Sequence, residues 1–177
     1  ECGQRAFGEN KVQDLSYKSQ TLESLPLEWH FIGNLQSNKI NALLKLKPFM
    51  FHSLHSLSLA NELQKRLERE NLTLKTLLQI NSAKETTKSG FDPESAYESY
   101  LQIQETCPNI KLCGLMSIGA HTQDTKIIQN SFELTSKICE KLQKNAANIL
   151  SMGMSGDFEL AIKCGSNCVR LGGTLFK

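Results

Sequence analysis

The sequence lacks long hydrophobic runs, an excess of charge of either sign, and the patterns of a secreted protein. No apolar stretch approaches the roughly 20 residues that a membrane-spanning helix needs. The 20 basic and 18 acidic residues give a formal net charge of +2 and are scattered, so no one-sided field attracts nucleic acid or a membrane surface. The first residues carry no signal-peptide pattern, and we expect a cytoplasmic protein.

The cysteines and histidines do not form a recognisable disulfide or metal pattern. None of the six cysteines belongs to a C-x-x-C pair. Without a secretory signal, we expect free thiols that pack as small apolar residues. His52 and His55 lie in a short strand-like run, where their side chains would point to different faces. We therefore expect no metal site.

What the sequence does have is a regular alternation of short apolar runs with longer amphipathic runs. This pattern predicts repeated βα units and a parallel sheet. The predicted strands cover residues 5–9, 28–33, 49–53, 74–81, 110–118, 148–152 and 167–171. The predicted helices cover residues 11–23, 39–47, 56–70, 92–105, 124–144 and 157–163.

Seven strands and six helices fall one unit short of an eight-stranded TIM-type (β/α)8 barrel, although an open doubly wound sheet has the same periodicity. Polar or glycine residues lie at the C-terminal ends of nearly every strand. A doubly wound sheet would collect them at a single switch point, so their spread favours the barrel. These strand-end residues are Asn10, Asn34, Asn81, Ser117, Ser151 and Gly172. The length suits one sizeable core, so we expect a single barrel domain over residues 1–177.

Two junctions near the C-terminus predict a phosphate-binding site. Residues 153–157 lead from a strand into a helix, whose free N–H groups would face the strand-end side of the barrel, and Ser155 adds a hydroxyl. After the last strand, Gly172 and Gly173 allow close backbone approach, and Thr174 supplies a second hydroxyl. Barrels commonly bind phosphate here. The alternative is that these residues only cap a helix and make a turn.

Three further residues are candidates for the same site. Arg170 lies in the last predicted strand, where a buried arginine must be paired or face a ligand. It could bind a ring nitrogen and keep that nitrogen unprotonated, or form an ion pair inside the barrel mouth. His30 lies among apolar residues and is either a core residue or a pocket wall. Lys88 lies in a loop, where it could reach a ligand or be solvated.

Several motifs together resemble the YggS/PROSC family of pyridoxal 5′-phosphate homeostasis proteins. They occur in the family's order over essentially the whole chain. The motifs are FGEN at 7–10, WHFIGNLQSNK at 29–39, KSG at 88–90, GLM at 114–116, SMGMS at 151–155 and VRLG at 169–172. The resemblance implies a fold similar to the N-terminal barrel domain of alanine racemase, without the second β-domain of that enzyme.

The resemblance also implies a cofactor, pyridoxal 5′-phosphate. Its phosphate would be bound at Ser155 and at the residues that follow the last strand, and its pyridine nitrogen would lie near Arg170. The remaining implied contacts are Asn10 lining the pocket, and Lys88 and Met116 near the mouth. We add His30 as a pocket wall. The implied cofactor-binding residues are therefore Asn10, His30, Lys88, Met116, Ser155, Arg170, Gly172, Gly173 and Thr174.

The family is regarded as binding and buffering this cofactor, with no general enzymatic activity established. We find no acid–base pair in the sequence and expect a non-enzymatic carrier, a monomer, with pyridoxal-phosphate-dependent apoenzymes as partners. The alternatives are a racemase-like enzyme with the same cofactor and a non-catalytic interaction scaffold.

Two differences from the family pattern bear on the site. The family's first strand carries the lysine that forms the Schiff base, and we expect this strand and its helix upstream of Glu1, so this chain offers no catalytic residue. Gly173 stands where a hydroxyl residue is usual, and Thr174 beside it supplies one.

Overall fold

The computed structural model describes residues 3–85 and 88–175, and its centre is one parallel sheet. Every strand pairs in parallel with the next strand of the chain. A parallel connection needs a crossover, and each crossover here contains a helix. The strands are β1 (Ala6–Glu9), β2 (Glu28–Phe31), β3 (Met50–Leu54), β4 (Leu74–Ile80), β5 (Ile110–Ser117), β6 (Ile149–Met154) and β7 (Cys168–Arg170).

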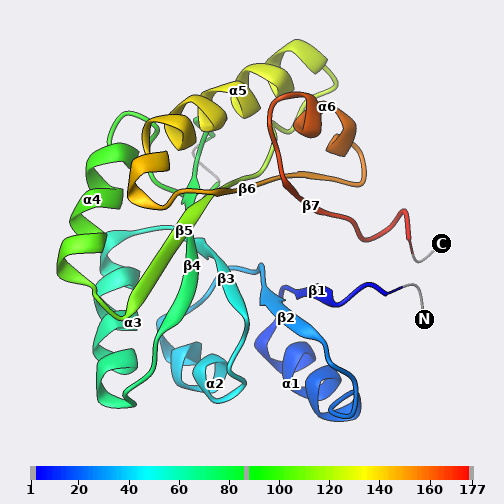
Figure 1. Cartoon of the computed structure of the whole chain (residues 1–177). Coiled ribbons are helices and arrows are strands. Elements are labelled where there is room, and N and C mark those ends of the chain that lie inside the picture. The colour runs from blue at the N-terminus through cyan, green and yellow to red at the C-terminus, as the bar shows by residue number, and fades with distance from the viewer. Residues whose placement is uncertain (1–2, 86–87, 176–177) are drawn as a thin grey trace.

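In the described part of the chain, six α-helices lie outside the curved sheet (Figure 1). They are α1 (Val12–Thr21), α2 (Ile40–Lys45), α3 (Leu57–Arg69), α4 (Ala96–Thr106), α5 (Thr125–Lys141) and α6 (Phe158–Lys163). Two 3-10 helices, η1 (Ser37–Lys39) and η2 (Gln143–Asn145), flank α2 and α5. All seven predicted strands and all six predicted helices are confirmed, with shifted ends.

The start of α4 shows why one end was predicted wrongly. We expected the helix from residue 92, on the strength of an aspartate followed by proline. Asp92 instead accepts a hydrogen bond from the Glu94 N–H at 2.8 Å and closes a turn, and the helix begins only at Ala96. Asx turns and helix N-caps use the same residue types, so the sequence pattern did not separate them.

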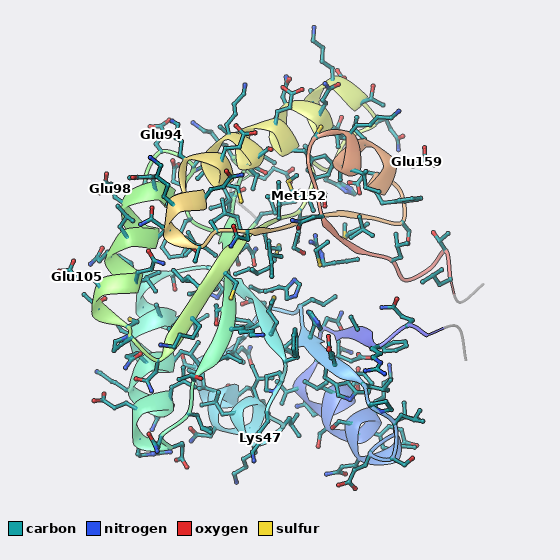
Figure 2. The ribbon with its side chains drawn as sticks, viewed as in Figure 1. Lys47, Glu94, Glu98, Glu105, Met152 and Glu159 are labelled. Carbon is teal, nitrogen blue, oxygen red and sulfur yellow. The ribbon has the colours of Figure 1, made fainter. Side chains whose placement is uncertain are left out.

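The two faces of the sheet bury different clusters. The outer face packs against the helices, and α3 presents the apolar residues Leu59, Leu63 and Leu67 to it. The inner face holds a smaller cluster around Met50, Leu77 and Met116. The charged side chains lie on the other side of the helices: Figure 2 shows the exposed Glu98 and Glu105 projecting from α4 away from the sheet.

The sheet forms a nearly closed barrel with β1 and β7 as its edge strands. Figure 1 shows both chain ends on the side where these edges lie. With seven described strands, the arrangement is the predicted TIM-type barrel with one strand fewer than eight. Glu1, before which we expected the Schiff-base lysine, lies outside the described residues. None of the described helices combines the length and the apolar character that crossing a membrane requires.

Candidate functional site

The first junction of the candidate site is the turn between β6 and α6. Gly153 adopts a φ of +92°, and a Cβ there would lie 2.7 Å from the Ala161 Cβ and 2.8 Å from the Phe158 Cα. Only glycine fits this conformation and this space. Asp157 accepts a hydrogen bond from the Met154 N–H at 2.6 Å. Its carboxylate is therefore used to close the turn.

The second junction follows β7 and touches the first. The Ser155 Oγ accepts a hydrogen bond from the Gly172 N–H at 3.3 Å. A Cβ added at Gly172 or at Gly173 would meet no atom within 4 Å, so space is open beside both residues. Gly173 and Thr174 are exposed. The structure thus brings together the two predicted junctions, which we call the cup (Ser155 and 172–174), while their role as phosphate ligands stays a prediction.

Arg170 precedes Gly172 of the cup by two residues, and its guanidinium donates hydrogen bonds to neutral oxygens. Its Nη1 donates to the Ser151 backbone oxygen at 2.9 Å and to the Ser151 Oγ at 2.7 Å. Its Nη2 donates to the Ser117 backbone oxygen at 2.9 Å. No carboxylate pairs with it among the described residues, so the ion pair that we considered is absent there. Burial lowers the pKa of the guanidinium, which stays cationic at neutral pH.

Two histidines extend this hydrogen bonding across the barrel. The His52 Nδ1 lies 3.1 Å from the Ser151 Oγ, and the His52 Nε2 lies 2.8 Å from the His30 Nδ1. The His30 ring also stacks against Phe49, with ring centroids 5.3 Å apart. His30 is thus partly buried and hydrogen-bonded inside the barrel, between the two alternatives that we left open. We call Arg170, Ser151, His52 and His30 the interior row.

His52 was missed as part of this arrangement because its partners come from different strands. The register pairs His30 with Met50, and His52 lies two residues further along β3 on the same face of the sheet. Alternation alone would have placed His52 on the inner face. Identifying its partners, His30 and Ser151, also required the order of the strands in the sheet. His55, with which we compared it, lies beyond the end of β3.

Lys88 and Met116 line a cavity of about 190 Å³ at the ends of β2 to β5. The Lys88 Nζ donates to the Glu85 Oε1 at 2.9 Å and to the Gly119 backbone oxygen at 2.9 Å. Lys88 is therefore neither simply solvated nor fully available to a ligand. Met116 is buried, with 1% of its surface exposed, and the same cavity is lined by Asn81.

Asn10 lines a second cavity of about 210 Å³, together with Lys11, Asn34 and Lys39. Gly33 is required at its edge, because a Cβ there would lie only 1.9 Å from the Asn10 backbone oxygen. Asn34 lines both cavities. The predicted cofactor-binding residues therefore lie at three places: the cup with the interior row, the cavity beside Lys88, and the cavity beside Asn10.

Residues 3–85 and 88–175 contain no cluster of three histidine, cysteine or acidic side chains that could hold a metal ion. The expectation that the protein has no metal site stays a prediction. The described cysteines are free thiols, and Cys2 lies outside the described residues.

Comparison with known proteins gives one consistent result. Residues 5–177 match the family described as alanine racemase, N-terminal domain. The pyridoxal phosphate homeostasis protein of Helicobacter pylori strain 26695 is 60% identical over 99% of this chain and 78% of its own length. The human protein of the same name is 37% identical over 98% of this chain and 68% of its own length.

Solved structures agree with the sequence matches. PipY of Synechococcus elongatus, solved with pyridoxal phosphate bound, superposes with a TM-score of 0.86 at 32% identity and covers 99% of this chain and 82% of its own. The same protein without the cofactor gives a TM-score of 0.91 over 99% of this chain and 83% of its own. An alanine racemase of Clostridium difficile shares the fold at 17% identity and a TM-score of 0.77, over 97% of this chain and 44% of its own.

Proposed function

The chain belongs to the alanine racemase N-terminal domain family and to its branch of pyridoxal phosphate homeostasis proteins, and on this basis we propose that it binds pyridoxal 5′-phosphate and acts in its homeostasis. The observation that carries the proposal is the cup joined by the Ser155–Gly172 hydrogen bond, with Arg170 two residues before Gly172 and hydrogen-bonded to Ser151. PipY, a relative with the same fold, has been solved with this cofactor.

The residues of the cup fit a phosphate. The open space beside Gly172 and Gly173 lets a phosphate oxygen approach backbone N–H groups, as anion-binding turns require. The hydroxyls of Ser155 and Thr174 would add donors. Asp157, the carboxylate of the turn between β6 and α6, already accepts the Met154 N–H, so its negative charge is partly offset.

Arg170 fits the pyridine ring. Five N–H groups belong to an arginine side chain, and three of them are used by Ser151 and Ser117. The two donors that remain would be available to a ring nitrogen of the cofactor. Because a guanidinium donates but does not accept, a nitrogen bound to it stays unprotonated.

The other predicted contacts belong to the same proposal. His30, Met116 and Lys88 line or support the inner wall of the barrel, and Asn10 would close the pocket from the β1 edge. We propose that the whole chain, residues 1–177, forms the one barrel domain that holds the cofactor.

A carrier role fits the site better than catalysis. When bound, pyridoxal phosphate supplies an aldehyde that condenses with amines and a ring that withdraws electrons. An unprotonated ring nitrogen withdraws electrons less strongly, which suits storage of the cofactor. The relatives are named for homeostasis. We propose a monomer without catalysis that works in the cytoplasm and passes the cofactor to pyridoxal-phosphate-dependent apoenzymes.

The test is the affinity of the chain for pyridoxal 5′-phosphate, measured by equilibrium dialysis, compared with that for pyridoxal, which lacks the phosphate. We expect the phosphorylated form to bind more tightly, and Ser155→Ala and Arg170→Ala to weaken that binding. Ser24→Ala and Arg69→Ala, both at exposed positions outside the site, are the matched controls. Absence of binding, or binding that neither Ser155→Ala nor Arg170→Ala weakens more than the two controls do, would overturn the proposal.

A further inference from the structure

The interior row connects the candidate cofactor site with the opposite side of the barrel. Arg170 comes from β7, Ser151 from β6, His52 from β3 and His30 from β2. Successive side chains lie 2.7, 3.1 and 2.8 Å apart. Ser151 and His52 are almost fully buried, at 0% and 1% exposed. Only the Arg170 end belongs to the proposed contacts of the pyridine ring.

The hydrogens in this row have one arrangement that satisfies every contact between its side chains, and it leaves the buried His30 Nε2 without a partner among the described residues. Arg170 donates to the Ser151 Oγ, so the serine hydroxyl must place its own hydrogen elsewhere. His52 Nδ1 is the acceptor within reach among the described residues. A His52 that accepts at Nδ1 carries its hydrogen on Nε2 and donates it to the His30 Nδ1. The reverse arrangement would leave the Ser151 hydroxyl hydrogen without an acceptor there.

The row works only while His52 is neutral. Burial, together with the nearby His30 and Arg170, lowers the pKa of His52 to about 3. Burial also lowers the pKa of His30, against the opposing effect of Glu28. A proton on both nitrogens of His52 would turn Nδ1 from acceptor into donor and place a second cation beside Arg170.

We propose that His52, oriented by His30, is a positioning residue: it accepts the hydroxyl hydrogen of Ser151, so that the Ser151 Oγ presents its lone pair to Arg170 and fixes the guanidinium that faces the pyridine nitrogen. The proposal rests on the proposed function, because only that function identifies the ligand facing Arg170 as a pyridine ring. It concerns the orientation of Arg170, and the phosphate contacts of the cup do not depend on it.

Three substitutions of His52 separate this role from simple packing. His52→Asn keeps a side-chain acceptor near the position of Nδ1 and so keeps the contact with Ser151. His52→Gln extends an amide toward the position of Nε2 and keeps only the contact with His30. His52→Leu removes both contacts while preserving an apolar volume.

The first measurement needs no cofactor. In the ¹⁵N-labelled chain, we expect His52 to be neutral and protonated on Nε2, and the Arg170 Nε–H to give a single sharp signal. His52→Asn should retain that Arg170 signal, whereas His52→Gln and His52→Leu should broaden or shift it. If His52→Leu does not fold, the comparison of Asn with Gln still decides. Equal Arg170 signals in Asn, Gln and wild type would overturn the proposal.

The second measurement uses pyridoxal 5′-phosphate and inorganic phosphate. Loss of one hydrogen bond to a charged group corresponds to about a tenfold change in affinity. We expect His52→Gln to weaken pyridoxal-phosphate binding by about that factor and to change its absorption spectrum, while the affinity for inorganic phosphate stays the same. Equal weakening for both ligands would indicate general damage to the barrel and would contradict a positioning role.

The two proposals fail in different ways. If wild-type chain binds no pyridoxal 5′-phosphate but the Arg170 signal depends on His52 as described, the proposed function fails and the hydrogen-bonded row stands. If wild type binds the cofactor and His52→Gln behaves as wild type in both measurements, the positioning role fails alone.

Discussion

The cup and the interior row are adjacent along the chain, since Arg170 of the row precedes Gly172 of the cup by two residues, and they are built differently. The cup is partly exposed, has open space beside Gly172 and Gly173, and is joined by one long hydrogen bond from the Gly172 N–H to Ser155. The row is fully buried at Ser151 and His52 and partly buried at Arg170 and His30, and each of its side chains bonds to the next.

This difference separates two tasks in binding. A phosphate carries its own charge and can be held by backbone N–H groups that stay open until it arrives. A pyridine nitrogen offers one lone pair, so its partner must point in the correct direction beforehand. Such orientation is supplied by side chains that are fixed by packing and hydrogen bonds. Changes in the cup should therefore affect binding alone, and changes in the row should affect both binding and stability.

Arg170→Leu should have the largest effect, because Arg170 is the residue of the interior row that would contact the pyridine nitrogen. It would leave the backbone oxygens of Ser117 and Ser151 without their donor, at about 1–3 kcal/mol for each buried group. We expect a loss of about 3 kcal/mol in the free energy of unfolding, measured in urea, together with loss of most cofactor binding. Arg69→Leu, which breaks a surface pair with Glu70, should change the free energy by less than about 1 kcal/mol. Equal losses in both variants would contradict the account.

The second largest effect should be a pH dependence of the free energy of unfolding that comes from His52 in the interior row. The pKa of His52 falls from 6.5 to about 3 in the folded chain, so the unfolded chain binds the additional proton between these values. Stability must then decrease as the pH falls through this window, by about 1.4 kcal/mol per pH unit from this residue.

The measurement is urea unfolding at pH 6.5 and at successively lower pH, for wild type and His52→Gln. The other titrating groups are the same in both chains, so the difference in slope reports His52. We expect a flatter dependence in His52→Gln and an unchanged slope in Ser155→Ala. A wild-type slope in His52→Gln would show that the buried histidine is not neutral in the folded chain.

Gly172→Ala should change the cup without changing the interior row. Its methyl group would enter space that contains no atom within 4 Å, so we expect the free energy of unfolding to stay within about 0.5 kcal/mol of wild type. The same methyl group would lie where a phosphate must approach the backbone. Binding of pyridoxal 5′-phosphate in a dialysis experiment should weaken by about fivefold, or about 1 kcal/mol. Unchanged binding would move the phosphate site away from β7.

Lys88→Gln should have the smallest effect, because Lys88 lies outside both regions. It would break the pairing with Glu85 and the bond to the Gly119 backbone oxygen, for less than about 1 kcal/mol in the free energy of unfolding. Glu85 also accepts the His121 N–H at 3.0 Å. We expect hydrogen exchange of that amide to become faster while exchange in β6 stays the same. Faster exchange in both places would show that the loop supports the row.

Most of the fold could be predicted from the sequence, because local patterns of apolar and polar residues determine where the strands and helices lie. Short apolar runs placed the strands, and the longer amphipathic runs between them placed the helices. The glycines and the serine of the cup follow consecutive strands, so adjacency in the barrel brought them together. The Ser155 and Gly172 junctions were therefore predictable as neighbours. Their function as phosphate ligands rests on the family and on the proposed function.

The interior row could not be predicted in the same way. It joins β2, β3, β6 and β7, and a shift of one residue in any of these registers would turn a side chain to the other face. The contacts of Lys88 likewise depend on where two loops meet. Local signals also failed where one residue type has two uses, as at Asp92, which makes a turn where we predicted a helix start.

The most direct test of the central claim is to record the amide and arginine side-chain NMR signals of the chain while adding pyridoxal 5′-phosphate. The account predicts that the signals of Ser155, Gly172, Gly173 and the Arg170 Nε–H shift together with one affinity, and that pyridoxal shifts them less. Shifts confined to the cavity around Asn10 and Lys39, or no shifts at all, would contradict it.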